Sequence, residues 1–234
     1  MMGVSGNSYS QVRRLVSILF VFAFFGSAGL LYGGEKIPEI LAGVRSHYGT
    51  LPGLTVPYKR EIVTRSMAML GTQMKGDLAT GLIYFKPPHF LKLEQQTPKI
   101  EYVMSDGKVL WWYIPEKALA YQYPSKKLGK ELQVLSDTFQ GLKQAEENFK
   151  ITLKEDEEKK LYLLNLVPDP PWQQVEHIGL LIDPQDYRIR MIAIYNYVGG
   201  ITRFMLEKLS VRYDLEESSF QFKAPEGVKV LEEN

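Results

Sequence analysis

The chain has 234 residues, with 28 lysines and arginines against 27 aspartates and glutamates, so its formal net charge is +1. A hydrophobic content of 45% argues against disorder, and the length suits one domain with a sizeable core. The balanced charge argues against a global field that would recruit nucleic acid, and the absence of cysteine excludes disulfides, thiolate metal sites, thiol catalysis and lipidation on cysteine.

Residues 1–34 have the pattern of an export signal. Two adjacent arginines precede the apolar run Leu15 to Phe25, and small residues follow that run. We expect a signal peptide over residues 1–34 and a mature domain over residues 35–234, with cleavage between about Gly29 and Glu35. The alternative is an uncleaved membrane anchor, because the apolar character continues a few residues further.

The mature chain is predicted to begin with an amphipathic helix that Gly49 closes. Its apolar residues are spaced three and four apart, which is the helical period, and they are Ile37, Ile40, Leu41, Val44 and Tyr48. This helix is a candidate cover for a sheet.

Short strand-like runs follow the helix and predict an antiparallel meander. They are rich in β-branched and aromatic residues and are separated by turn residues, namely glycine, proline and aspartate. The predicted strands are 57–69, 73–86, 90–95, 100–104 and 109–114.

Asp106-Gly107 predicts a hairpin between the last two of these strands. With those two residues as the turn, Met104 faces Val109 and Tyr102 faces Trp111, so one face of the hairpin is wholly apolar. The other face also carries large apolar side chains, namely Val103, Leu110, Trp112 and Ile114. Such a sheet needs a cover on both sides.

A change of period predicts a helix between Ser125 and Phe149. Its apolar residues form one stripe at three- and four-residue steps: Leu128, Leu132, Leu135, Phe139 and Leu142. An excursion of this length between strands is either a mobile lid or a helix packed permanently on the sheet, and the periodicity favours neither.

The remaining chain predicts a second meander. The expected strands are 149–153, 160–168, 174–182, 188–197 and 201–213, and Asp183-Pro184 and Gly199-Gly200 are good turn sequences between them. No repeat or low-complexity linker divides the chain, which favours a single domain.

Catalytic and metal-binding readings find no support in the sequence. The three histidines, His47, His89 and His177, lack the spacing of metal ligands, and no nucleophile elbow, P-loop or dinucleotide fingerprint is present. We therefore predict no catalytic residue, no metal and no cofactor. The aromatic residues between 102 and 123 lie near lysines and suggest a nucleic-acid platform, but the overall charge and the export signal argue against nucleic acid as a partner.

Two blocks of the sequence resemble the LolA-type periplasmic carriers of outer-membrane lipoproteins. The first runs from the glycine-opened strand Gly81 to Pro88, through Ser105-Asp106-Gly107-Lys108, to Tyr113-Ile114-Pro115. The second is the closing pattern from Phe220 to Val228. The blocks lie far apart and in the family's order, so the resemblance spans most of the mature chain.

The resemblance implies a mainly β (α+β) fold, in which a half-open antiparallel β-barrel wraps around helices that form a lid over an apolar cavity. It implies a cleaved, periplasmic carrier, expected to be monomeric, that binds the acyl chains of lipidated proteins. Such a carrier accepts them from an inner-membrane lipoprotein-releasing transporter and delivers them to an outer-membrane acceptor. The alternatives are a related lipid binder, a lipoprotein sensor or a membrane-anchored interaction module.

The apolar face of the strands and the stripe of the helix provide the residues for this cavity and lid. The predicted acyl cavity consists of Leu91, Leu93, Tyr102, Met104, Val109, Trp111 and Tyr113, and the predicted lid stripe of Leu128, Leu132, Leu135 and Phe139. One position departs from the family, which commonly carries a lid-closing arginine where this chain has Pro87. Proline donates no hydrogen bond, so the resemblance predicts a lid that is weaker or held by other groups.

Overall fold

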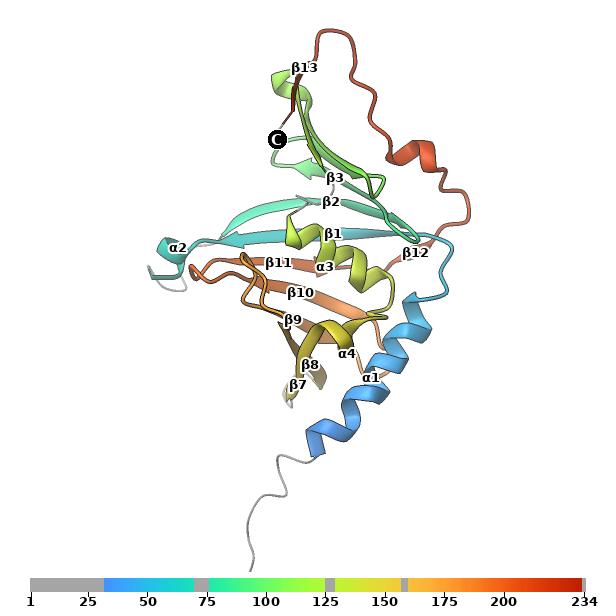
Figure 1. Ribbon diagram of the computed structural model, residues 1–234, viewed down its shortest axis with the longest axis vertical. Helices are drawn as coiled ribbons and strands as arrows, with labels where there is room; N and C mark the ends of the chain where they lie inside the picture. The colour runs from blue at the N-terminus through green and yellow to red at the C-terminus, as the bar shows by residue number, and fades with distance from the viewer. Residues whose placement is uncertain (1–31, 70–75, 125–128, 157–159, 233–234) are drawn as a thin grey trace, which may run out of the picture.

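The computed structural model describes residues 32–69, 76–124, 129–156 and 160–232 (Figure 1). The first half of the chain contains helix α1 (Tyr32–Tyr48), strand β1 (Leu54–Val63), helix α2 (Arg65–Met69) and strands β2 (Asp77–Lys86), β3 (Phe90–Thr97), β4 (Glu101–Ser105), β5 (Val109–Ile114) and β6 (Leu119–Pro124), with the 3-10 turn η1 (Pro115–Lys117) between the last two. The second half contains helices α3 (Lys130–Phe139) and α4 (Ala145–Asn148), strands β7 (Phe149–Asp156), β8 (Leu161–Pro168), β9 (His177–Ile182), β10 (Ile189–Tyr195), β11 (Ile201–Leu206), β12 (Ser210–Val211) and β13 (Lys229–Glu232), and the 3-10 turn η3 (Glu217–Phe220).

The described strands form one open sheet of 13 strands in the order β13-β6-β5-β4-β3-β2-β1-β11-β10-β9-β8-β7, with β12 beside β1. The β13–β6 pair is parallel and the other pairs are antiparallel. Strand β1 joins the two meanders, because it pairs with β2 along one edge and with β11 along the other. The predicted half-open antiparallel architecture is confirmed, and the sheet does not close.

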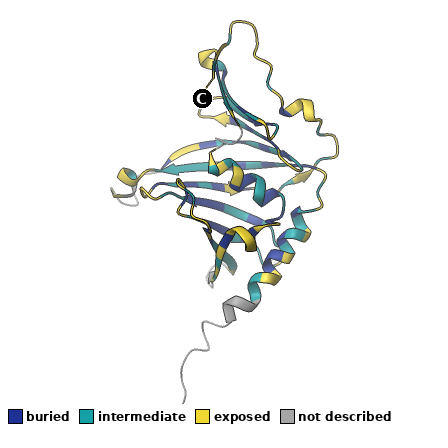
Figure 2. Ribbon diagram, in the orientation of Figure 1, coloured by how far each residue is buried: buried dark blue, intermediate teal, exposed yellow. Residues whose placement is uncertain are grey.

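The sheet curves around α1 and α3, and its inner face holds the core (Figures 1 and 2). We call the side that faces these helices the inner face and the opposite side the outer face. The core cluster draws its inner-face members from almost every long strand, and α1 contributes Ile40, Leu41, Val44 and Tyr48. These helical residues are the ones that the sequence periodicity identifies.

Most predicted strands correspond to observed ones within a few residues at their ends, and residues 73–75 lie outside the described residues. Three differences are larger. Strand β1 ends at Val63 and the chain continues as α2, so the predicted strand over 57–69 is too long. Strands β6 and β13 were not predicted, since neither has a clear alternating pattern between turn signals. The last predicted strand, 201–213, is divided into β11 and β12.

The helix predicted between residues 125 and 149 is also divided. Helix α3 ends at Phe139, and Gly141 and Leu142 both have positive φ angles, +81° and +54°, which end the helical path. A Cβ atom on Gly141 would lie 3.0 Å from the Arg45 Cα, so glycine is needed for the close approach to the end of α1 as well as for the turn. Residues 125–128, including Leu128 of the predicted lid stripe, lie outside the described residues.

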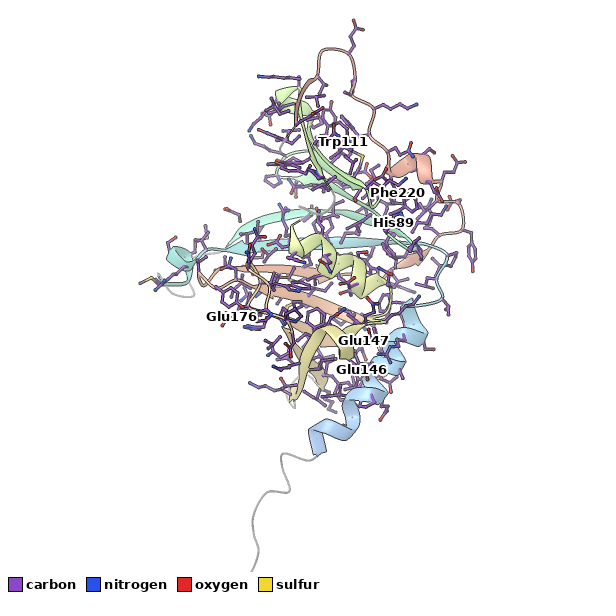
Figure 3. The ribbon with its side chains drawn as sticks, viewed as in Figure 1. His89, Trp111, Glu146, Glu147, Glu176 and Phe220 are labelled. Atoms are coloured by element: carbon purple, nitrogen blue, oxygen red, sulfur yellow. The ribbon has the colours of Figure 1, made fainter. Side chains whose placement is uncertain are left out.

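The outer face of β3, β4 and β5 has its own cover, which we call the C-terminal strap (residues 214–228). The Phe90 ring lies 5.6 Å from the Phe220 ring, and the rings of Trp111 and Tyr113 lie 5.1 and 4.9 Å from Phe222. Strand β13 then joins the edge of the sheet (Figure 1), and Figure 3 labels Trp111 and Phe220 in this region. The cover that the sequence predicts for the hairpin is therefore present on its outer face.

We predict that Phe220→Ala lowers the free energy of unfolding by about 3 to 5 kcal/mol, because it removes a ring that is only 1% exposed and leaves a cavity. Thermal and denaturant unfolding measure this loss. Tyr213→Ala, at a side chain that is 86% exposed beside the strap, is the matched control and should change little. Equal effects of the two substitutions would show that the strap does not pack as described.

Candidate functional site

The inner face of β1, β2 and β3 forms an apolar floor. Cross-strand pairing places Leu54 opposite Phe85 and Val56 opposite Ile83, and then Phe85 opposite Leu91 and Ile83 opposite Leu93. On the other side of β1 the floor continues through Phe204 and Leu206 of β11 and through the inner residues of β10, β9 and β8. This continuous apolar surface is the part of the fold best suited to bind a hydrophobic ligand.

The structure divides the predicted cavity residues between the two faces of the sheet. Leu91 pairs with Ser105 and Leu93 with Val103, so these two leucines lie on the inner face. The other five, Tyr102, Met104, Val109, Trp111 and Tyr113, lie on the outer face, on the side of the C-terminal strap. The prediction that all seven share one face is therefore wrong.

The reason for this error is the connection between β3 and β4. Side chains alternate along a strand, so one residue more or less in a connection moves a whole strand's side chains to the other face. The segment from Pro98 to Ile100 has no turn signature that specifies its register, and the sequence therefore did not show that Leu93 faces Val103 and not Tyr102.

The hairpin register itself is shifted by two residues from the prediction. Met104 pairs with Trp111 and Tyr102 with Tyr113, because the turn is longer than Asp106-Gly107 alone. The Asp106 Oδ1 atom accepts hydrogen bonds of 2.9 Å from the backbone N–H groups of both Lys108 and Val109, which extends the loop. A shift of two keeps each side chain on its face, so the predicted grouping within the hairpin is correct.

Helix α3, the lid helix, packs on the apolar floor. Leu135 and Phe139 are 0% and 1% exposed, and Leu132 is half-buried against the same cluster. The Phe139 ring lies 5.9 Å from Phe85 on β2 and 6.3 Å from Tyr48 on α1. The described part of the predicted lid stripe therefore faces the floor.

The lid helix is held by polar contacts near its first turn. The Thr202 hydroxyl of β11 donates a hydrogen bond of 2.9 Å to Glu131, and the Lys130 ammonium lies 4.4 Å from the centre of the Trp172 ring. At the position where the family carries its arginine, Pro87 donates nothing, and the neighbouring Lys86 reaches Glu217 of the strap at 3.9 Å. The closed lid is therefore fastened from β11 and from the β8–β9 connection.

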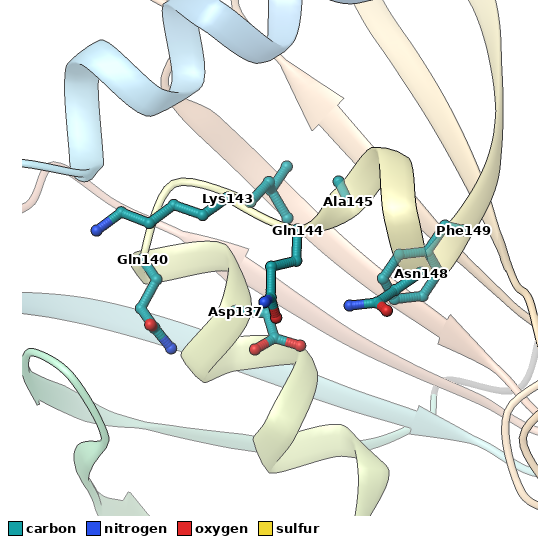
Figure 4. Close-up of a pocket in the computed structure, with 8 residues that line it drawn as sticks. Asp137, Gln140, Lys143, Gln144, Ala145, Asn148 and Phe149 are labelled. Carbon is teal, nitrogen blue, oxygen red and sulfur yellow. The ribbon is translucent and has the colours of Figure 1, made fainter.

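Two pockets open beside the lid helix. The larger, about 420 Å³, lies at its first turn, where Val175 and Ile194 of the core form part of the wall and the exposed Tyr197 and Val198 stand at the rim. The smaller, about 240 Å³, lies at the last turn and reaches to Phe149 at the start of β7 (Figure 4). The larger pocket thus lies between the lid helix and the end of β10, and the smaller between the lid helix and α4.

Asp137 brings a carboxyl group from the lid helix into the smaller pocket. Burial raises its pKa to about 6, and this effect outweighs a hydrogen bond from Gln133 and the charge of Lys130, which both lower the pKa. Figure 4 shows the side chain with the polar ends of Gln144 and Asn148 around the same space. The lid therefore carries a group whose charge changes just below neutral pH.

We predict that Asp137→Asn stabilises the protein above about pH 7 and has little effect below about pH 4. A carboxyl whose folded pKa is raised contributes stability when protonated, and it loses that contribution as the pH rises through about 6. The neutral amide removes the loss, which is on the order of 2 kcal/mol. Thermal unfolding of both proteins across this pH range measures the difference in stability, and Glu147→Gln, at an exposed side chain, is the control. A gain in stability that does not depend on pH would contradict the raised pKa of Asp137.

The sequence analysis missed a polar group on the inner face. Arg60 of β1 donates a hydrogen bond of 2.8 Å to Gln95 of β3, and Trp112 of β5 donates one of 3.0 Å to Glu101 of β4. The alternation of Tyr58 and Arg60 along β1 was a signal for this placement, because residues two apart in a strand share a face.

Two other features, a metal-binding group and a membrane-spanning helix, are absent from the described residues. Among them, no group of three or more histidine, aspartate or glutamate side chains is placed to hold a metal ion. In the same part of the chain, no helix has both the length and the apolar character needed to cross a membrane. An open antiparallel half-barrel with a helix on an apolar inner face thus defines a binder of hydrophobic ligands.

The chain belongs to the LolA family of outer-membrane lipoprotein carrier proteins, whose model matches residues 70–223. An outer-membrane lipoprotein carrier protein of Azotobacter vinelandii is 24% identical over 165 residues, which cover 70% of this chain and 75% of that protein. The family is periplasmic and consists of carriers and binders of lipidated molecules, and membership supports a lipid-binding role for this chain.

Solved structures also resemble this chain at low identity. A LolA superfamily protein from Nitrosomonas europaea is 12% identical, with 79% of this chain and 97% of that chain covered and a TM-score of 0.45. A DUF1329 family protein from Desulfovibrio piger is 11% identical, with 78% and 95% covered and a TM-score of 0.47. At these scores the structural likenesses carry no argument about function.

Proposed function

We propose that the protein is a periplasmic carrier that binds the acyl chains of lipoproteins on the inner face of its sheet and moves them from the inner to the outer membrane. The observation that supports this most is the continuous apolar floor beneath a lid helix with a matching apolar stripe. In this proposal residues 1–34 form a signal peptide that is removed, and the monomeric mature protein exchanges cargo with a lipoprotein-releasing transporter and an outer-membrane acceptor.

The physical need for such a carrier is the cost of exposing acyl chains to water, about 0.8 kcal/mol for each methylene group. In the closed form the floor is covered by Leu135 and Phe139 of the lid helix. Acyl chains take the place of these side chains when the lid swings away, so one apolar contact replaces another. The exchange requires only a modest difference in free energy between the closed and open forms, which keeps binding reversible.

The proposed ligand-binding residues follow from the inner face. They are Leu91 and Leu93 of the original prediction, together with the other inner-face residues Val56, Ile83, Phe85 and Val103. The lid residues are Leu132, Leu135 and Phe139. The predicted residues on the outer face have no part in this site, because the C-terminal strap covers that face.

We predict that a photo-reactive phenylalanine analogue at Val103 captures lipoprotein or lipid in the cell envelope, whereas the same analogue at Tyr102 does not. The two positions are neighbours in β4 and are both half-buried, but they lie on opposite faces of the sheet. Mass spectrometry of the crosslinked product identifies the cargo. Capture at Tyr102 alone would place the ligand on the outer face, and capture at neither position would reject the carrier function.

We predict that fastening the lid helix to β11 abolishes cargo binding. The chain has no cysteine, so Glu131→Cys with Thr202→Cys, at two side chains that are hydrogen-bonded at 2.9 Å, gives a unique pair for a short thiol-reactive bridge. Binding of a fluorescent acyl probe should fall at least tenfold after bridging, because the chains cannot displace the helix. Each single-cysteine variant, treated in the same way, is the control. Unchanged affinity of the bridged protein would show that α3 is a fixed part of the core.

A further inference from the structure

Arg60 places a positive charge on the inner face, at the end of the run of apolar residues Leu54, Val56 and Tyr58. It pairs with Phe204 of β11 on one side and with Ala79 of β2 on the other. Among the inner-face positions of β1, β2, β3 and β11, all of which the structure describes, Arg60 is the one basic side chain. An arginine in this position requires a compensating contact.

The side chain of Arg60 crosses the small residues of β2. The inner-face positions of that strand beside it are Ala79 and Gly81, and a Cβ atom on Gly81 would lie 2.1 Å from the backbone oxygen of Glu94. The path to β3 is therefore open, and the Arg60 Nη2 atom donates a hydrogen bond of 2.8 Å to Gln95 Oε1. Gln95 is 7% exposed and donates to the Lys99 backbone oxygen at 2.9 Å, which keeps its own oxygen directed at the guanidinium group.

This contact does not satisfy the arginine. The Gln95 amide is neutral, and the buried Arg60 Nε atom has no hydrogen-bond acceptor. No ion pair of the described residues includes Arg60. Two acidic side chains share this face nearby, Asp77 of β2, opposite Ile62, and Glu101 of β4, opposite Gln95. Glu101 accepts the hydrogen bond of the Trp112 indole. The Arg60 side chain is half-buried, so its guanidinium group is partly removed from water without an anionic partner, which costs free energy.

We propose that Arg60 binds the acidic head group, carboxylate or phosphate, of an amphiphile whose acyl chains lie on the apolar floor. This inference rests on the proposed function and names the chemical class of ligand that the same site prefers. An acidic group supplies both the negative charge and the acceptor oxygens that a planar guanidinium binds best. The resulting contact uses the Nε atom that is left without an acceptor.

The position of Arg60 suits a ligand with one polar end. The inner-face residues that follow it along β1 are Tyr58, Val56 and Leu54, all of them 2% exposed or less, and they extend the apolar floor for six residues, about 20 Å of strand. A head group at Arg60 therefore directs long chains along this strand and beneath the lid helix. A neutral lipid would cover the same floor but leave the charge without a counter-ion.

The test compares parinaric acid with its methyl ester, a pair of fluorescent probes that differ in charge and share the same chain. At a pH where the acid is ionised, the wild-type protein should bind the acid about tenfold more tightly than the ester, the size expected for a charge-assisted hydrogen bond. Arg60→Gln should remove this preference and leave the affinity for the ester unchanged. Arg60→Lys keeps the charge and should retain part of the preference.

The control is Arg203→Gln, which removes an arginine on the outer face of β11 that already pairs with Glu61 at 2.9 Å. It should leave both affinities unchanged. Inorganic phosphate is added as a competitor, because displacement of the acid by phosphate alone would show a site for free anions and would reject the head-group role. Equal weakening of acid and ester in Arg60→Gln would show that Arg60 only shapes the floor, and would also reject it.

The wild-type protein alone gives a decisive result even where Arg60→Gln fails to fold. Equal affinity for acid and ester would overturn the head-group inference while supporting the apolar floor as a lipid site. Binding of neither probe would overturn the proposed function together with the inference.

Discussion

The constraint on which the rest of this structure depends is a β-sheet that is apolar on both faces. Burial of apolar surface is the main favourable term in folding, so neither face of the β3–β5 region is stable in water. The inner face is covered by α3, whose Phe139 packs on Phe85, and the outer face by the C-terminal strap. The two covers are held in different ways. The strap leads into β13, which pairs with β6 through backbone hydrogen bonds, whereas the polar contacts that hold α3 are a few side-chain contacts.

In the proposed function this difference makes the inner cover the one that is exchanged for cargo. Backbone pairing anchors the strap along four residues of β6, and such a cooperative ladder opens only at a high cost in free energy. The polar contacts of α3 are half-exposed, where single hydrogen bonds contribute little to stability. The carboxyl group of Asp137 further weakens the helix's contact with the sheet near neutral pH, because its ionised form is poorly solvated. The hydrophobic contacts of Leu135 and Phe139 therefore provide most of the closure.

The sequence was informative where periodicity and turn chemistry act locally. It identified α1, the extent of β5 and the two faces of the Asp106-Gly107 hairpin, and the family resemblance supplied the half-barrel and the lid. It did not show which face of the hairpin lies on the same side of the sheet as Leu91 and Leu93. The side depends on the number of residues in the irregular connection between β3 and β4. The role of Arg60 was also hidden, since its meaning comes from Gln95 and Gly81, which are distant in sequence and adjacent only in the folded sheet.

The position of the C-terminal strap has a consequence for how the chain matures. Ribosomes make the hairpin of Trp111 and Tyr113 more than a hundred residues before Phe222, which lies against both rings. Until the last residues emerge, this nascent hairpin presents an uncovered aromatic surface with a free strand edge at β6, the combination most prone to aggregation. The outer face of this hairpin is thus completed only after residues 214–232 have been made, so its native packing is a late event in folding.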